Sequence, residues 1–253
     1  MKNILLLFIL TASLVSCVKD KIEDPFLDYT REYYPLETGK YITYAIDSIV
    51  FDDALTGNKK DTASFILREE IALIEIEDND TIFYVHRLRK DDPADNWRLT
   101  DVWTARYNGQ EVLRTEENLT FRKLLFPLRD GRRWTATSYI HPNTTILIGT
   151  ENVQAFQAWE AQVTEFDIAD QIGTFSFVDD NVMHVIQTDT DDGNSKRYVM
   201  EKYARHIGLV HRIDTILDSK CHDLPDQSPC FGQPWIEHAS KGYILSQVMI
   251  DHN

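Results

Sequence analysis

Apolar residues that alternate with polar ones recur along most of this chain, and this pattern constrains the fold more than any other feature. Between Lys40 and Val50, for example, alternation places Ile42, Tyr44 and Ile46 on one face. Successive side chains of a β-strand point to opposite sides of a sheet, so such a segment buries one face and exposes the other. The pattern therefore predicts a half-buried strand here.

The same alternation predicts strands in series. The further candidates are Phe65 to Glu77, Thr81 to Arg89, Arg98 to Tyr107, Gln110 to Arg114, Trp159 to Phe166, Asn181 to Thr188, Gly208 to Ile216 and Tyr243 to Ile250. Asn108-Gly109 is a strong hairpin signal, because both residues tolerate positive φ. Strands joined by short turns indicate an antiparallel, mainly β domain.

Helical signals are scarce. Ser195 to Ala204 is the best candidate, because Val199 and Tyr203 are four residues apart and would lie on one face of a helix. We therefore expect little helix, with this segment as its main example.

The N-terminus reads as a signal peptide of residues 1–16. Lys2 precedes an apolar run from Ile4 to Leu14, which is too short to span a bilayer. Leu14-Val15-Ser16-Cys17 follows and resembles the lipobox of bacterial lipoproteins, which implies acylation of Cys17. The alternative is an ordinary signal peptide with a chance cysteine. We expect residues 17–32 to form a lipid-anchored tether and residues 33–253 a single β-rich domain.

Composition and charge limit the classes of function. Apolar residues make up 43% of the chain and aromatic residues 11%, which is typical of a folded protein. The formal net charge is −15. A field of that sign repels phosphate backbones, so nucleic acid is not an expected partner.

Two cysteines remain once Cys17 is assigned to the lipid. Cys221 and Cys230 flank a segment with two prolines, and an exported protein reaches a compartment that permits oxidation. We therefore predict a Cys221–Cys230 disulfide. The alternative is a metal site that adds His222 and His238, although the spacing matches no common zinc pattern.

One segment of the sequence recurs after 92 residues. Tyr34 to Thr43 and Phe126 to Thr135 both read aromatic-Pro-Leu-x-x-Gly-basic-x-apolar-Thr. Proline fixes φ on entry to a turn, and glycine supplies positive φ where the chain leaves it. The repeat indicates either a duplicated half-domain or two uses of one turn-into-strand device.

Motifs of catalysis and metal binding are absent from the sequence. Neither GxSxG nor HExxH occurs, and we expect no cofactor, no metal and no catalytic residue. The acidic stretch Asp189 to Asn194 reads as a solvated turn rather than a calcium loop, because it lacks the glutamate of an EF-hand. His184 reads as a hydrogen-bonded strand residue. The tryptophans could form a sugar-stacking platform, but packing is the commoner role for each one: Trp97, Trp103, Trp134, Trp159 and Trp235.

Three segments carry a family resemblance. They are YYPLETGKYITY from Tyr33, FPLRDGRRWTA from Phe126 and YARHIGLVHRI from Tyr203. The chain resembles envelope lipoproteins of the Bacteroidota, which often share these short motifs. The resemblance implies a curved antiparallel sheet, an open half-barrel or a sandwich. It transfers no catalytic residue, because proteins of this kind are mostly uncharacterised.

Four Asp-Ser or Asp-Thr dipeptides are followed by Ala or Ile, which gives acceptor candidates at Ser48, Thr62, Thr81 and Thr215. The pattern is similar to the acceptor of the periplasmic O-glycosylation system of the Bacteroidota. The alternative is ordinary turn-and-strand chemistry. A glycan needs an exposed position, so Thr62, expected in a loop, is the best candidate.

The sequence favours a non-enzymatic envelope lipoprotein that binds a lipid, a glycan or a protein. Two alternatives stay open: a hydrolase that acts on envelope or glycan polymers, and a structural subunit of a surface complex. The expected location is the outer membrane, through the lipid anchor. Lys19 and Lys21, followed by Glu23-Asp24, are similar to a surface-export signal, so display outside the cell is a further expectation.

Overall fold

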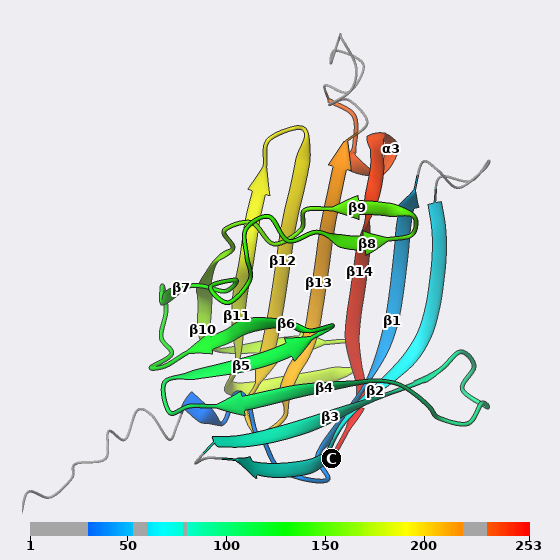
Figure 1. The fold of residues 1–253 in the computed structure, drawn as a ribbon. Helices are drawn as coiled ribbons and strands as arrows, with labels where there is room; N and C mark the ends of the chain where they lie inside the picture. Colours follow the sequence, from blue (N-terminus) through cyan, green and yellow to red (C-terminus); the bar gives the residue numbers. More distant parts are fainter. Residues whose placement is uncertain (1–29, 53–59, 78–79, 220–231) are drawn as a thin grey trace, which may run out of the picture.

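A computed structural model describes residues 30–52, 60–77, 80–219 and 232–253 of the chain. The fold is mainly β, as expected, with a large, curved antiparallel sheet that does not close into a barrel (Figure 1). The strands are β1 (Tyr41–Asp52), β2 (Lys60–Glu77), β3 (Asp80–Lys90), β4 (Arg98–Tyr107), β5 (Glu111–Glu116), β6 (Leu119–Leu125), β7 (Arg133–Thr135), β8 (Ile146–Ile148), β9 (Glu151–Val153), β10 (Glu160–Ile172), β11 (Phe175–Asp191), β12 (Ser195–Ala204), β13 (Gly208–Ser219) and β14 (Ala239–His252).

The main sheet consists of two meanders joined side by side. Its order is β6-β5-β4-β3-β2-β1-β14-β13-β12-β11-β10-β7, so β1 to β6 form one half, and β7 with β10 to β14 form the other. The halves meet where β1 pairs antiparallel with β14. The small strands β8 and β9 form a separate hairpin.

The repeated sequence segment opens each of these halves. Gly39 before β1 has φ 86°, and Gly131 before β7 has φ 71°. The amide of Gly39 donates to the carbonyl of Ile71 at 2.8 Å, and that of Gly131 donates to the carbonyl of Val163 at 2.9 Å. The two copies therefore share the turn, the cross-strand bond and the place at the start of a meander, which both a duplicated half-domain and two uses of one device would produce.

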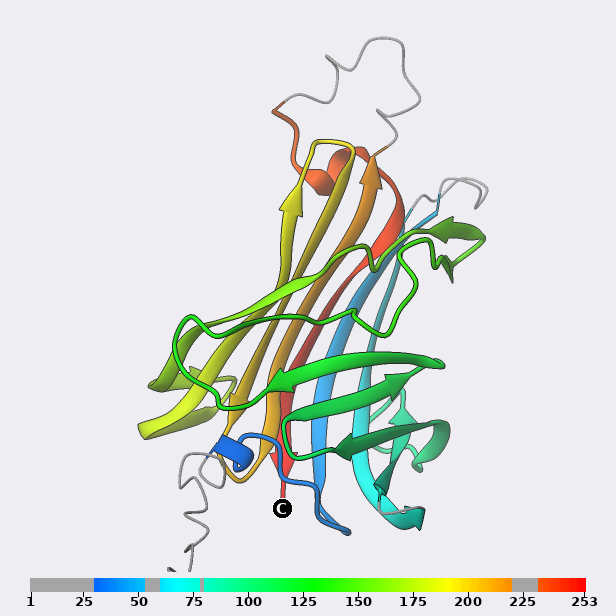
Figure 2. The ribbon, with the colours of Figure 1, turned by 60° about the vertical axis from the view of Figure 1, so that its left-hand side comes forward.

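The sheet folds over on itself. β2 carries a bulge between Ile71 and Leu73, a device that bends a strand. Beyond it, β3 to β6 form a front layer that crosses a back layer made of β11 to β14 (Figures 1 and 2). The largest core fills the space between these layers and includes Phe121 of β6 and Val185 of β11. A second core, with Met249, packs under the tip of the β10–β11 hairpin.

The expected helix at Ser195 to Ala204 is wrong, because this segment is strand β12. Val199 and Tyr203 are both fully buried, but a spacing of four also fits a period of two. Burial alternates between successive residues along the segment, which is the pattern of a strand and not of a helix. The short helix α3 spans Trp235–His238.

The described part of the chain begins inside the expected tether. Thr30 and Tyr33 are fully buried, and the amide of His206 donates to the carbonyl of Glu32 at 2.7 Å. Residues 30–32 therefore pack against the folded domain. Among the described residues, no helix has the length and hydropathy needed to cross a bilayer.

Candidate site: a cleft above a buried ionic network

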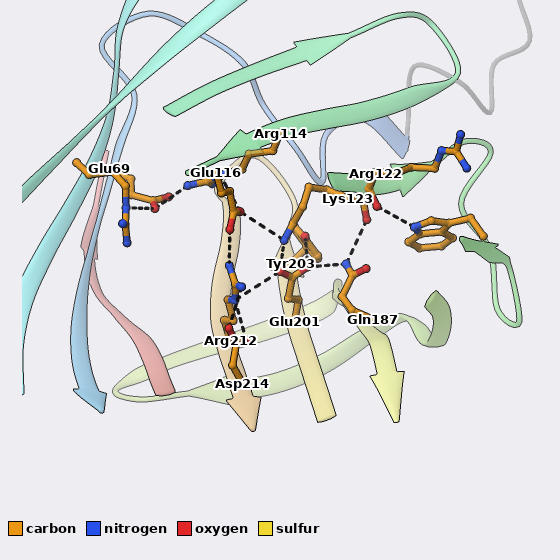
Figure 3. A network of polar contacts seen from close by, with 12 residues as sticks. Glu69, Arg114, Glu116, Arg122, Lys123, Gln187, Glu201, Tyr203, Arg212 and Asp214 are labelled. Atoms are coloured by element: carbon orange, nitrogen blue, oxygen red, sulfur yellow. Dashed lines mark hydrogen bonds and ion pairs between the residues drawn. The ribbon is translucent and has the colours of Figure 1, made fainter. Parts of the chain in front are cut away.

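Eight charged side chains form a network between the front layer and the back layer of the sheet (Figure 3). The cations are Arg87, Arg114, Lys123 and Arg212, and the carboxylates are Glu69, Glu116, Glu201 and Asp214. Most of them are buried; Glu201 has no exposed side-chain surface. Buried charges on this scale are rare in proteins unless they are paired.

The alternation of side chains along each strand places these charged groups on the inward faces of the layers. Arg114 and Glu116 are two residues apart on β5, and Arg212 and Asp214 are two apart on β13, so each pair shares a face. Both faces point inward because the front layer folds over β12 and β13 (Figures 2 and 3). The sequence analysis did not identify this network. The available signal was the charged residues on the inward face of otherwise apolar strands.

Glu201 is the most highly connected carboxylate. It accepts hydrogen bonds from Gln187 Nε2 at 2.6 Å and from the Tyr203 hydroxyl at 2.6 Å. It also pairs with Lys123 Nζ. Because Lys123 lies on β6 and Glu201 on β12, this ion pair fastens the front layer to the back layer.

Further ion pairs join the remaining members of the network. Arg212 binds Asp214 in a bidentate manner, with both distances 2.8 Å, and reaches Glu116 Oε2 at 3.3 Å. Arg114 Nη2 lies 2.7 Å from Glu69 Oε1 and Arg87 Nε lies 3.2 Å from the same oxygen. Arg87 Nη1 also lies 3.7 Å from Asp101 Oδ2, a carboxylate at the edge of the network.

Three carboxylates of the network are held in the ionised state. The pKa values of Glu69, Glu116 and Glu201 all lie below the ordinary 4.5. Burial alone would raise these pKa values, and the facing cations lower them by more. The largest lowering contribution comes from Arg114 for Glu69, from Arg212 for Glu116 and from Lys123 for Glu201. A general acid requires a raised pKa, so these three groups are poorly suited to donate a proton.

A cleft of about 490 Å³ opens above this network. Its walls come from β3 to β6, from the β8–β9 hairpin and from β13 and β14. Phe121, Phe156 and Leu245 supply apolar surface, and Leu147 lies at the cleft with 68% of its surface exposed. The volume falls within the roughly 300–1,000 Å³ typical of small-ligand pockets.

One residue that lines the cleft carries a buried donor without a partner. Trp103 Nε1 has almost no accessible surface and makes no hydrogen bond within the described residues. The Trp103 ring is held in place by Arg87, whose guanidinium carbon lies 3.6 Å from the ring centroid. A buried donor without a partner costs about 1–3 kcal/mol, so such groups require an explanation.

The remaining tryptophans do not form a platform. Trp134 and Trp159 are buried in the largest core, as the packing interpretation predicted. Trp97 stacks against Arg68 and Lys90 and does not line the cleft. Trp235 lies in the short helix α3.

His184 is a hydrogen-bonded strand residue, as predicted. It lies in β11 between Glu165, which pairs with its Nδ1, and Asp170, whose Oδ2 is 2.7 Å from its Nε2. The acidic stretch after it ends in a turn. There Asp192 Oδ1 accepts the backbone amides of Asn194 and Ser195.

The predicted modification sites lie apart from the cleft. Thr62 is exposed, but the expected loop is wrong, because Thr62 belongs to β2. Ser48 in β1, Thr81 at the start of β3 and Thr215 in β13 are half-buried. The predicted lipidation site and disulfide fall outside the described residues: Cys17, Cys221 and Cys230.

Comparisons with known proteins give no family. No family model matches the chain, and no curated protein matches it. One solved structure is a protein of Parabacteroides distasonis proposed to be a lipoprotein, with 9% identity, coverage of 87% of this chain and 98% of that one, and a TM-score of 0.39. Another is a protein of Bacteroides fragilis proposed to be exported, with a YmcC-like fold, 13% identity, coverage of 87% and 97%, and a TM-score of 0.36. Likenesses at these scores transfer no property to this chain.

Proposed function

We propose that this chain is a non-enzymatic binding module of the cell envelope, and that its ligand enters the cleft above the ionic network. The observation that carries the proposal is a cleft of about 490 Å³, a size typical of small-ligand sites, whose lining combines apolar side chains with charged groups. Hydrolysis is less well supported, because the carboxylates at the cleft are already paired with cations.

A bulky substitution at the mouth of the cleft tests the binding site. We expect Leu147→Trp to weaken ligand binding about tenfold, because the larger ring occupies space that the ligand needs. The control is Val178→Trp, since Val178 is similarly exposed, at 61%, and does not line the cleft. The measurement is the ligand-induced rise in melting temperature over a panel of envelope glycans, peptides and lipids.

The outcome has two clear forms. A compound that stabilises the wild type and V178W, but not L147W, supports the cleft as the binding site. Equal stabilisation of all three proteins, or none by any class in the panel, would rule it out.

We further propose that the module is anchored to the outer membrane through lipid on Cys17. The support is the Leu14-Val15-Ser16-Cys17 box after an apolar run. More than one acyl chain is needed for stable anchoring, and acylated lipoproteins meet that condition. Surface display remains part of this proposal.

Replacing the lipidated cysteine tests the anchor. We expect Cys17→Ser to move the protein out of the membrane fraction, because the thioether that carries the lipid cannot form. Intact-mass measurement of the wild type should show the acyl groups on a chain that begins at residue 17. A variant that fractionates with membranes like the wild type would argue against the anchor.

The same mass measurement reports the proposed covalent modifications. Thr62 is the strongest glycan acceptor of the four, because it is the exposed one, and Ser48, Thr81 and Thr215 remain weaker candidates. The Cys221–Cys230 disulfide remains a proposal that rests on the sequence.

A further inference from the structure

The β8–β9 hairpin presents a free strand edge to the cleft. The two strands form a sheet of their own, so each has one edge that no other strand of the described residues covers. The cleft lining takes Ile146 and Leu147 from β8 and no residue from β9, which places the free edge of β8 at the cleft. Strand β6, which ends the main sheet, lies on the other side of the cleft (Figure 1).

The main chain of Leu147 faces outward along this edge. Gly149, with φ 61°, and Thr150 form the two-residue turn of the hairpin, and the pair that flanks such a turn is hydrogen-bonded. Pairs alternate along an antiparallel ladder, so Leu147 and Asn152 direct their N–H and C=O groups away from each other. Lys241 Nζ donates to the Asn152 carbonyl at 3.2 Å, which agrees with this direction on the β9 side. On the β8 side, no described residue bonds to the amide or the carbonyl of Leu147.

Both sides of the cleft offer backbone groups that are fixed in place. Thr150 at the hairpin tip donates to the buried carboxylate of Asp52, through its amide at 2.6 Å and through its hydroxyl at 2.9 Å. Across the cleft, the amide of Arg122 donates outward from β6 to the carbonyl of Ala136 at 2.8 Å. Thr120, two residues earlier with no bulge between, presents its N–H and C=O on the same edge. An incoming strand would therefore meet backbone groups from β8 and from β6.

The side chains around this edge suit a peptide with apolar residues at alternate positions. Leu119, Ile146 and Leu245 are half-buried in the cleft lining, so a ligand can still reach them. In an extended peptide, every second side chain would face these residues. Glu117 is exposed at the cleft and makes no ion pair within the described part of the chain, whose full sequence carries a net charge of −15. Charge complementarity therefore favours a basic residue in the peptide.

We propose that the cleft binds an extended peptide segment of a partner protein, which adds a strand to the free edge of β8. The segment has apolar side chains at alternate positions and at least one basic residue. In binding by strand addition, main-chain hydrogen bonds supply the affinity and pockets for alternate side chains supply the specificity. The inference rests on the proposed binding function and names the class of its ligand.

Proline at the free edge tests the inference. Leu147→Pro removes the N–H that faces the peptide and puts a ring in its place, and proline is tolerated where the N–H of an edge strand points outward. Leu147→Ala is the reference, because it also loses the leucine side chain but keeps the N–H. Asn152→Pro is the matched control, since it makes the same change at the cross-strand partner, outside the cleft lining. The probes are peptides selected from a random heptapeptide library on the full acylated chain in detergent, and calorimetry measures their affinity.

We expect selection to enrich peptides in which apolar and polar residues alternate and which contain lysine or arginine. They should bind wild type and N152P alike, and L147P about tenfold more weakly than L147A, the combined effect of a lost hydrogen bond and steric exclusion. The peptide amides are also N-methylated one at a time. Methylation of the amide that pairs with β8 should weaken binding to the wild type by a similar factor, a result that does not depend on the folding of a variant.

Three results would overturn the inference at different levels. Peptides that bind L147P as tightly as L147A, or that tolerate N-methylation at every amide, would exclude strand addition. Selection of acidic peptides, or of none while a glycan or a lipid stabilises the wild type and not L147W, would overturn the peptide assignment and keep the cleft as a site. If no class of ligand responds to substitution of Leu147, the binding function itself is overturned.

Discussion

Replacement of Glu201 by Gln is expected to lower the free energy of unfolding by about 3–5 kcal/mol, the cost of breaking a buried ion pair by removing one partner. The amide keeps the size of the side chain, but Lys123 is left as a buried cation without its closest carboxylate. Lys123 is only 6% exposed, so water cannot compensate it. Urea unfolding followed by tryptophan fluorescence measures the change.

Two further variants separate charge burial from a general effect of losing a glutamate. Glu165→Gln removes a carboxylate that is 53% exposed and paired with His184, and it should cost less than about 1 kcal/mol. Lys123→Met added to Glu201→Gln should recover most of the loss, because no unpaired cation remains. A double variant that is less stable than E201Q would show that the pair contributes more than charge compensation.

Acid should destabilise this protein strongly. Glu69, Glu116 and Glu201 have pKa values below their ordinary 4.5 because facing cations outweigh the effect of burial. A carboxylate with a lowered pKa in the folded state contributes stability above its unfolded pKa. This contribution is lost as the pH falls through the folded value. The free energy of unfolding should therefore be steady near neutral pH and fall steeply below about pH 4.5.

Urea unfolding at a series of pH values measures this dependence. The Lys123→Met/Glu201→Gln double variant is the matched control, since it lacks one of the coupled carboxylates, and its loss of stability in acid should be shallower. A wild-type stability that stays level down to about pH 3 would contradict the lowered pKa values. A double variant whose stability falls with pH as steeply as that of the wild type would also contradict them.

Much of the fold follows from local pattern. The alternation around Tyr44 and Ile46 predicted β1, and the expected segment from Arg98 to Tyr107 coincides with β4. The repeated turn was also visible, because glycine with positive φ leaves a clear sequence signal. The helix expected at β12 was wrong because a spacing of four residues, from Val199 to Tyr203, fits both the helical period of about 3.6 and the strand period of two. The spacing of that pair alone could not decide between helix and strand.

The candidate site depended on distant contacts that no local pattern shows. Lys123 and Glu201 are 78 residues apart in the chain, and each alone reads as one of many surface charges. The bulge in β2 and the fold-over of β3 to β6 bring them together between two layers. Trp103 likewise became notable only when its buried Nε1 was found without a partner.

The sequence by itself determined the class of fold and the turn chemistry, and it predicted export and lipidation, because each depends on residues that are close together in the chain. Tertiary structure alone decided which charges are buried, which donors are left unpaired and where a ligand could enter. The physical reason is that burial and pairing depend on which strands face each other across the folded sheet. That arrangement is set by the register of the whole sheet and by its bulges, including those in β2 and β3.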